Sequence, residues 1–434
     1  MINSLSVIFA AGDPIDNDKF SLTTLLIIAG KAVAIFVILL IGVMLYIWFM
    51  RKVIADMQNR IGPSKAGPFG ILQSLADGTK LFFKEQSIPD NADRSMFRIA
   101  PYFAIVPAFM AFAIIPIGGT VEIAGHTTNL QLVDLPMGIL WLLMMSGLGL
   151  YGVLLAGWSS GSKYPLLGSI RASAQLLSYE ATLGLAVVGA VIQSGSLSTR
   201  TIVDAQNASG AWGFTHWFFI PAFISFALFL LSAVAETNHP PFDLVEAEQE
   251  LVCGFHTEYT GIRFAIFFLA EFMNLITMSA VAVTLFLGGT SGPLTGSGNW
   301  VDTWILPTTY FLVKLIALLY GTVWLRAALP RLRYDQLMSL AWKYLIELSF
   351  LWVAALLVLR VSKSQNWAFV NNSESVTGIV VAFLTVIGGF TIFMVLRKCI
   401  PNENENLLGS DLDSQSEAGR TLSSSNMAFS KEVK

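Results

Sequence analysis

The stretch "LTTLLIIAGKAVAIFVILLIGVMLYIWFM", residues 22–50, decides the class of fold to which this chain belongs. It holds one charged side chain, Lys31, in a long and mostly apolar run. A helix of about 20 apolar residues crosses the ~30 Å hydrocarbon core of a bilayer, whereas the apolar part of a cleaved signal peptide has only about 7–15 residues. The stretch therefore predicts a transmembrane helix and not a cleaved leader.

The composition of the whole chain agrees with this interpretation. Of its 434 residues, 54% are hydrophobic and 13% are charged, whereas soluble domains carry about 25% charged residues. A net charge of −3 argues against a broad basic surface for nucleic acid. The two cysteines, Cys253 and Cys399, lie far apart without a CxxC spacing, so we expect no iron–sulfur cluster and no metal site in this chain.

Apolar runs of span length recur along the chain and predict an all-α integral membrane protein, because lipid cannot satisfy the polar groups of a non-helical backbone. Nine candidate spans follow in order: 24–50, 99–118, 138–158, 174–194, 217–235, 264–289, 303–325, 344–361 and 376–396. Lys and Arg are concentrated in the loops after spans 1, 3, 5 and 7. The positive-inside rule then places these loops in the cytoplasm, the N-terminus outside and the C-terminus inside.

Four segments follow from this layout. Residues 1–23 form an extracytoplasmic N-terminal segment, and residues 24–361 form a membrane domain with eight spans. Residues 362–396 contain one additional transmembrane helix. The polar, Ser- and Asn-rich tail at 397–434 is predicted to be disordered in the cytoplasm, because such a composition cannot bury enough apolar surface to fold.

The first cytoplasmic loop contains an amphipathic segment. From Phe69 to Glu85, apolar side chains such as Leu72, Leu75 and Phe82 fall on one helical face, and Asp and Lys side chains fall on the other. This pattern predicts a helix that lies along the membrane surface. Packing of the helix on the other spans is an alternative, and the two interpretations are compatible.

The stretch "AETNHPPFDLVEAEQELV", residues 235–252, is rich in carboxylates and has no Lys or Arg near it in the sequence. Asp243 followed by Glu246 is a capping-box arrangement, which would start a helix after the two prolines. On that helix Asp243, Glu246 and Glu250 share a face, and like charges so close raise each other's proton affinity. The stretch therefore predicts a helix cap, a proton-exchanging cluster, or both. A metal site is a rival interpretation, but hard cations usually take ligands at tighter loop spacing.

Ionisable residues also fall inside the predicted spans, where they are costly and usually functional. Glu271 lies in span 6, Lys314 in span 7 and Glu180 in span 4, and Glu236 follows span 5. We expect these groups to form a titratable path that leads into the membrane from the carboxylate-rich loop.

Two other patterns have structural explanations. Arg171, Gln175, Ser178 and Thr182 form a polar stripe on span 4, for which hydrogen bonding between helices is the alternative to a functional role. The string "GLGLYG", residues 147–152, matches G-x-G-x-x-G but lies inside span 3 without a preceding strand. It predicts a helix-packing face and not a dinucleotide site.

Five blocks of the sequence carry a family resemblance. They read "NRIGPSKAGPFGILQSLADGTKLFFKE", "GWSSGSKYPLLGSIRASAQLLSYE", "AETNHPPFDLVEAEQELVCGFHTEY", "FFLAEFMN" and "LPRLRYDQLMSLAWKYLI". In this order they resemble the H subunit of proton-translocating NADH–quinone oxidoreductase, or respiratory complex I, whose mitochondrial counterpart is NADH dehydrogenase subunit 1. The resemblance implies a membrane subunit at the junction of the two arms of the complex, which forms much of the quinone-entry chamber and links quinone reduction to proton translocation.

The resemblance also implies roles for individual residues. The proton relay would consist of Glu180, Glu236, Asp243, Glu246, Glu248, Glu250 and Glu271. The quinone chamber would be lined or bordered by Arg60, Lys65, Ser159, Lys163, Tyr164 and Arg171. Quinone would be the substrate, FMN and iron–sulfur clusters would lie in partner subunits of the membrane and hydrophilic arms, and the chain would reside in the bacterial plasma membrane.

The sequence departs from the family pattern at several positions. His239 stands where Arg is common, and Val245 and Glu347 stand where Pro is common. Two rival interpretations stay open: the equivalent subunit of a membrane-bound hydrogenase-type complex, and a stand-alone proton or cation transporter. The inverted repeat that many transporters carry is not visible in the sequence.

Overall fold

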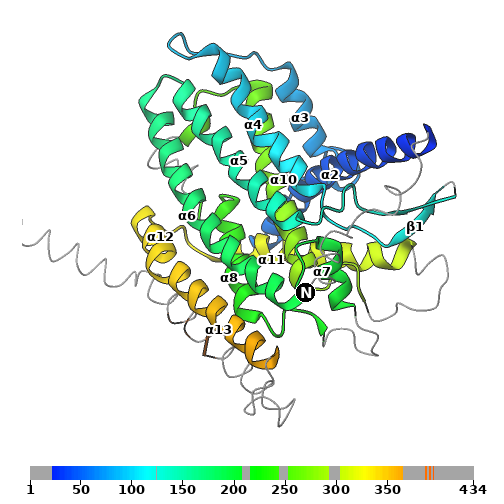
Figure 1. The fold of residues 1–434 in the computed structure, drawn as a ribbon. Coiled ribbons are helices and arrows are strands. Elements are labelled where there is room, and N and C mark those ends of the chain that lie inside the picture. Colours follow the sequence, from blue (N-terminus) through cyan, green and yellow to red (C-terminus); the bar gives the residue numbers. More distant parts are fainter. Residues whose placement is uncertain are drawn as a thin grey trace, which may run out of the picture. The chain divides into compact units, whose positions relative to one another are not determined.

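The structure is a computed structural model that describes residues 22–123, 125–207, 216–243, 253–292 and 304–364, with the single positions 387, 388, 391 and 394. The chain divides into a unit of residues 1–385 and a unit of residues 386–434. The described helices and strands with assigned bounds all belong to the first unit (Figure 1). They are helical almost throughout, which confirms the predicted all-α membrane class.

Seven helical segments of the described residues are long and apolar enough to cross a membrane. Six are single helices: α2 (Leu22–Met57), α4 (Arg94–Phe112), α5 (Gly138–Ser159), α6 (Lys163–Ser194), α10 (Gly261–Phe286) and α11 (Leu306–Ala328). The seventh segment joins α12 (Tyr334–Leu340), the π-helical turn η6 (Ala341–Leu345) and most of α13 (Ile346–Ser364). Apolar runs become helices because each backbone N–H and C=O is then bonded within its own segment.

The predicted spans up to residue 361 each contain a helix, with two differences. The fifth span corresponds to α8 (Phe223–Glu236), whose 14 residues measure about 21 Å, less than the ~30 Å core of a bilayer. The second span, predicted at 99–118, ends too late, because α4 stops at Phe112 and the buried apolar residues 113–115 follow it outside the helix. Most of the ninth predicted span at 376–396, and the whole tail at 397–434, lie outside the described residues.

Short elements connect the long helices. After α4 the chain forms a β-hairpin of β1 (Thr120–Ile123) and β2 (His126–Asn129), paired antiparallel with Val121 opposite Thr128. The other short elements are α7 (Thr199–Gln206) and the 3-10 turn η4 (Gly254–His256).

Backbone hydrogen bonds between loops show that consecutive helices run antiparallel. At one end, the N–H of Asp93 donates to the carbonyl of Ser159 over 3.0 Å, and the N–H of Leu332 donates to the carbonyl of Pro241 over 3.1 Å. At the other end, the N–H of Ile139 donates to the carbonyl of Leu197 over 3.1 Å. At the first end, the N–H of Ser87, after the first span, donates to Oγ1 of Thr260, after the fifth, over 3.0 Å. The loops after predicted spans 1, 3, 5 and 7 therefore meet at one end of the bundle. That this end faces the cytoplasm stays a prediction.

The central element is α10, which packs against α2, α4, α8 and α11 and is buried over most of its second half. Two of its three hydroxyl side chains bond to their own helix. The Oγ1 of Thr277 donates to the carbonyl of Met273, and the Oγ1 of Thr284 donates to the carbonyl of Val281, each over 2.8 Å. Polar side chains thereby enter the core with their hydroxyl groups satisfied.

Of the glycines in residues 147–152, Gly152 packs against a neighbouring helix, as the sequence predicted, whereas Gly149 has no heavy atom within 4 Å. A methyl group at Gly152 would lie 2.7 Å from the backbone nitrogen of Ala104 on α4, so α4 and α5 approach to a distance that only glycine allows. A methyl group at Gly147 would lie 3.0 Å from Oε1 of Glu180. This second glycine therefore makes room for a carboxylate.

The predicted amphipathic helix is present as α3 (Gln73–Phe83), after the 3-10 turn η2 (Pro68–Gly70). Its apolar face is open, and Phe83 is 92% exposed. Its polar face turns toward α2, where Nη1 of Arg51 lies 2.8 Å from Oδ2 of Asp77. Partial burial opposes the charge of Asp77, but the hydrogen bond and charge of Arg51 prevail and lower the pKa of this carboxyl. An amphipathic helix with a free apolar face is typical of one that rests on a bilayer.

Candidate functional site

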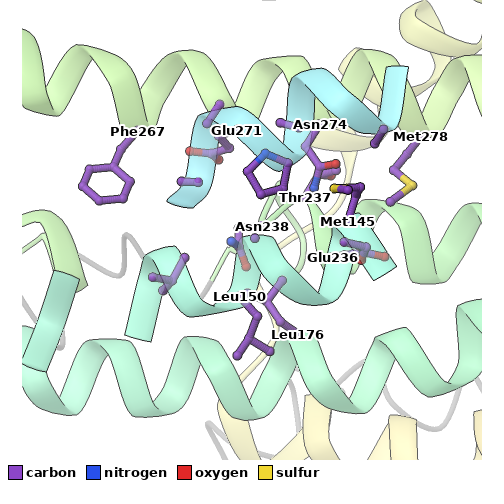
Figure 2. A pocket seen from close by; sticks show the side chains of 18 of the residues that line it. Met145, Leu150, Leu176, Glu236, Thr237, Asn238, Phe267, Glu271, Asn274 and Met278 are labelled. Carbon is purple, nitrogen blue, oxygen red and sulfur yellow. The ribbon is translucent and has the colours of Figure 1, made fainter. Parts of the chain in front are cut away.

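A cavity between α4, α5, α6, α10 and the turn after α8 gathers four carboxylates (Figure 2). We call it the inner cavity. Its volume is about 90 Å³, which gives room for several ordered water molecules. The polar residues of its wall are Ser146, Glu180, Glu236, Thr237, Asn238, Asp243, His256, Glu271 and Asn274. Carboxylates from α6, α8, α10 and the loop after α8 thus share one space.

Glu236 is the last residue of α8 and is buried. Its Oε1 accepts a hydrogen bond from the hydroxyl of Ser146 on α5. Its Oε2 is buried without a hydrogen-bond partner among the described residues. A buried carboxylate with one unfilled oxygen is a group at which a water molecule or a proton can bind.

Gln175 on α6 holds the turn that carries Glu236. Its side-chain Nε2 donates to the carbonyl of Ala235 over 2.9 Å and to the carbonyl of Phe242 over 2.8 Å. The same side chain therefore bridges the two ends of the connection between α8 and the carboxylate-rich loop. Gln175 therefore forms a hydrogen bond between α6 and α8, which was the structural explanation offered for the polar stripe of span 4.

Other members of the polar stripe also bond to neighbouring elements. The indole Nε1 of Trp342 donates to the hydroxyl of Ser178 over 3.0 Å. The guanidinium of Arg171 lies 4.9 Å from the centroid of the Tyr334 ring. These contacts attach α6 to the α12–η6 segment, as interhelical polar contacts do in membrane proteins.

Asp243 forms an ion pair with Arg331, which is distant in the sequence. Arg331, in the loop after α11, places Nη2 at 2.8 Å from Oδ2 of Asp243, and the two residues are 88 positions apart. The side chain of Asp243 is 7% exposed and that of Arg331 is 38% exposed. A long-range pair therefore supplies the positive charge that the local sequence lacks.

Glu271 has a histidine as its partner. The Nδ1 of His239 lies 3.3 Å from Oε1 of Glu271 and 2.9 Å from the carbonyl oxygen of Thr237. His256 on η4 lies near the same carboxylates. Burial lowers the pKa of His256, although the charges of Glu271 and Asp243 oppose this shift.

Several polar residues of the site were missed in the sequence, among them Ser146, Asn274 and Arg331. Asn274 follows Glu271 by three positions, so both side chains project from one face of α10. In Figure 2, Asn274 lies between Glu271 and Glu236 at the pocket wall. The i, i+3 spacing from Glu271 was the signal that could have found Asn274.

Two further cavities lead from the inner cavity toward the loop after α2. The middle cavity is lined by Ile47, Met50, Arg51, Asn238, His239, Pro240, Asp243, Phe268, Glu271, Phe272 and Arg326. The outer cavity is lined by Met50, Arg51, Ile54, Ala55, Arg60, Ile61, Gly62, Pro63 and Arg326. Neighbouring cavities share wall residues, so the three form a row. The outer cavity has a volume of about 420 Å³, within the range of sites that hold small organic molecules.

The six predicted quinone-chamber residues fall into two groups. Arg60 lines the outer cavity, and Lys65 is exposed a few residues further on. Ser159, Lys163 and Tyr164 lie at the turn from α5 to α6, and Arg171 lies in the third turn of α6. All four are outside the walls of the inner, middle and outer cavities.

Within the second group, Ser159 is buried, and its Oγ lies 3.4 Å from the hydroxyl of Tyr259. Burial raises the pKa of Tyr259 to about 12, so this phenol stays protonated at neutral pH. Lys163 and Tyr164 are exposed.

Lys314, which the sequence placed in the titratable path, lies outside the walls of the inner, middle and outer cavities. Its Nζ donates to the carbonyls of Leu287, Gly289 and Ser291 over 2.7, 2.9 and 2.7 Å, and lies 4.1 Å from the centroid of the Trp217 ring. These carbonyls follow the C-terminal end of α10, where a cation satisfies unpaired oxygens and the helix dipole. Lys314 therefore has a structural role.

Three of the predicted relay residues, Glu246, Glu248 and Glu250, lie outside the described residues, as does most of the predicted capping box. Among the residues that the structure does describe, no three His, Cys, Asp or Glu side chains come together as metal ligands.

These features define a multi-pass helical membrane protein with ionisable groups enclosed between its helices. A family model described as NADH dehydrogenase matches residues 30–357, and the chain belongs to this family. The resemblance to the H subunit of NADH–quinone oxidoreductase is thereby confirmed, because curated relatives of that name match most of the chain.

Three such relatives define the degree of similarity. The H subunit of the NADH-quinone oxidoreductase of Frankia casuarinae is 52% identical over 353 residues, which are 81% of this chain and 76% of the relative. The protein of the same name from Frankia alni is 49% identical over 82% of this chain and 78% of the relative. That of Streptomyces avermitilis is 45% identical over the same two shares.

Proposed function

We propose that this chain is the membrane subunit of a proton-translocating NADH–quinone oxidoreductase that borders the quinone-entry chamber and couples quinone reduction to proton movement. The observation that carries the proposal is the convergence of Glu180, Glu236, Asp243 and Glu271 on one cavity inside the helix bundle. Intramembrane carboxylates are costly, and they persist where protons or ions must pass. A cavity with room for water connects them without requiring direct contact.

The proton relay of the proposal starts in the carboxylate-rich loop. Glu246, Glu248 and Glu250 would collect protons beside the quinone chamber, and Asp243 lies where that loop meets the inner cavity. Glu271, Glu236 and Glu180 would then carry protons into the membrane. The hydrogen bond from Ser146 supports Glu236 as a member of the relay, because it holds one carboxylate oxygen and leaves the other open to water.

The quinone side of the proposal rests on the outer cavity. Met50, Ile54 and Ile61 form an apolar wall, while Arg60 and Arg326 bring guanidinium groups to the same space. A quinone presents an apolar ring and two carbonyl acceptors, and guanidinium groups only donate hydrogen bonds. Lys65, Ser159, Lys163, Tyr164 and Arg171 would border a chamber that partner subunits complete.

The reduction of quinone requires electrons, and in this proposal they come from other subunits. FMN and iron–sulfur clusters in partner subunits of the hydrophilic arm would deliver electrons from NADH. The chain would lie in the plasma membrane with its N-terminus outside and its C-terminus in the cytoplasm. The family match ends at residue 357, which supports the interpretation of residues 362–396 as an additional helix and of 397–434 as a cytoplasmic tail.

The first test is to purify the tagged chain from gently solubilised membranes and to assay the eluate. We expect a large assembly with bound flavin and inhibitor-sensitive NADH–quinone reductase activity. A small species without flavin that still moves protons or cations in liposomes would refute the proposal and favour a stand-alone transporter. A large assembly that evolves hydrogen instead of oxidising NADH would favour the hydrogenase-type alternative.

The second test addresses the relay. We expect Glu236→Gln, Glu246→Gln and Glu248→Gln to lower quinone reduction and proton pumping together, while NADH oxidation by a water-soluble acceptor is unchanged. The matched control is Glu122→Gln, because Glu122 is an exposed carboxylate on β1. Full pumping in all three cavity and loop variants would contradict the relay.

A further inference from the structure

His239 occupies the wall between the middle and inner cavities. Asn238, Asp243 and Glu271 line both of these cavities, and His239 lines the middle one. Its side chain is 5% exposed, and its ring meets Phe272 edge-on with centroids 5.3 Å apart. The imidazole is therefore buried in the wall of the middle cavity, next to residues that line both cavities.

The two ring nitrogens of His239 have different surroundings. Nδ1 lies 2.9 Å from the carbonyl of Thr237 and 3.3 Å from Oε1 of Glu271. Because a carbonyl oxygen can only accept, Nδ1 carries the hydrogen. In the neutral ring Nε2 is then an acceptor, and it is buried without a hydrogen-bond partner among the described residues. A buried basic nitrogen of this kind is a site at which a water molecule or a proton can bind.

Charges of both signs surround the ring. Arg51 on α2 and Arg326 on α11 line the middle cavity with it, and so do Glu271 on α10 and Asp243 in the loop after α8. Arg51 is paired with Asp77, and Asp243 is paired with Arg331. His256 on η4 is the other titratable group close to Glu271. Among the described residues, Glu271 has no Lys or Arg within salt-bridge distance, so His239 is the group that decides whether it faces a cation.

We propose that His239 and Glu271 act as a single proton-holding pair that passes protons between the middle and inner cavities. The proposal rests on the proposed function of the chain and assigns the pair a step within it. At 3.3 Å the imidazole and the carboxylate are close enough to hold one proton between them. The shared proton resides either on the imidazole, beside a carboxylate, or on the carboxyl, beside a neutral imidazole.

The transfer balances without any other reactant. Nε2 takes the excess proton of a hydronium ion in the middle cavity, which becomes a neutral water molecule, and the ring becomes an imidazolium. The Nδ1–H bond then breaks as an O–H bond forms on Oε1 of Glu271. Glu271 releases this proton to water of the inner cavity and is a carboxylate again. Exchange through water then resets the ring: Nε2 gives up its hydrogen to water as Nδ1 takes one from water, which restores the Nδ1–H that faces the carbonyl of Thr237.

Two variants of His239 test the pair in the purified complex. His239→Asn keeps an N–H that can reach the carbonyl of Thr237 but cannot ionise. His239→Arg keeps a positive charge beside Glu271 but cannot lose it near neutral pH. The measurement is the ratio of the wild-type to the variant rate of proton pumping in proteoliposomes across the pH range in which histidine ionises, about pH 5–8.

We expect both ratios to change with pH as a single ionisation, by up to about tenfold per pH unit. A purely structural role of His239 would lower the variant rates by a constant factor at every pH. Ratios that stay constant with pH would therefore overturn the proposal. The ratio is insensitive to a partial loss of assembly, because such a loss also acts equally at all pH values.

An infrared titration decides the question even if the variants do not pump. The carboxylic acid band to be followed is the one that Glu271→Gln removes from the purified assembly in nanodiscs. We expect its titration midpoint to differ between wild type and His239→Arg, and an unchanged midpoint would overturn the proposal. Absence of NADH–quinone reductase activity in the wild-type assembly would refute the proposed function, whereas the infrared result bears on the pair alone.

Discussion

The contact between Gly152 and α4 offers a direct test of the packing that encloses the inner cavity. In Gly152→Ala the new methyl carbon would lie 2.7 Å from the backbone nitrogen of Ala104 and 3.0 Å from its Cα and Cβ. Favourable contacts between carbon atoms lie at about 3.5–4.0 Å, so α4 and α5 must separate by roughly 1 Å. The obstructing atoms belong to a helix backbone and cannot rotate away. Overpacking of this kind costs about 1–3 kcal/mol.

Gly149→Ala is the matched control for this substitution. Gly149 lies on the same helix, and a methyl group there would have no heavy atom within 4 Å. Alanine also favours helix over glycine by about 1 kcal/mol. We therefore expect Gly149→Ala to be neutral or stabilising, and Gly152→Ala to lower the free energy of unfolding by about 2 kcal/mol.

The assay is unfolding of the purified chain in mixed detergent micelles, followed by helix content as the denaturing detergent is raised. The same preparation reports on the site, because Ser146 on α5 bonds to Glu236 on α8 and a displaced α5 weakens that bond. Equal stability of the two glycine variants would refute the argument, since it would mean that α4 and α5 are not in close contact at Gly152.

Three further predictions concern charged groups. Arg331→Gln removes the cation of a largely buried Asp243 and should cost about 2 kcal/mol, between the values of exposed and buried pairs; a double-mutant cycle with Asp243→Asn that gives no coupling would contradict this. Lys314→Met removes three interhelical hydrogen bonds worth about 0.6 kcal/mol each, so detergent unfolding should show a loss of about 2 kcal/mol, and unchanged stability would argue against the helix cap. Because the pKa of His256 is lowered in the folded chain, stability should fall as the pH drops below about 6.5; His256→Asn should flatten that acid limb in thermal unfolding, and an unaltered limb would assign it to other groups.

The local sequence was sufficient to predict the helices and to identify the family. Apolar runs of span length predicted the helices up to residue 361, because backbone hydrogen bonds within a helix depend only on residues four apart. The amphipathic period of residues 69–85 predicted α3 for the same reason. The five family blocks identified the relatives without any contact information. The sequence also grouped Glu180, Glu236 and Glu271, because ionisable residues are rare within membrane spans.

Contacts between distant segments were decided by the tertiary structure alone. The cation of Asp243 comes from Arg331, 88 positions away, and the imidazole of His239 reaches Glu271 on another element. The sequence placed Lys314 in the titratable path, but folding brings its ammonium to three carbonyls beyond the end of α10. Periodicity reports which face of a helix is apolar. The partner of each polar group depends instead on how the helices pack together, and that packing is set by contacts between residues far apart in the chain.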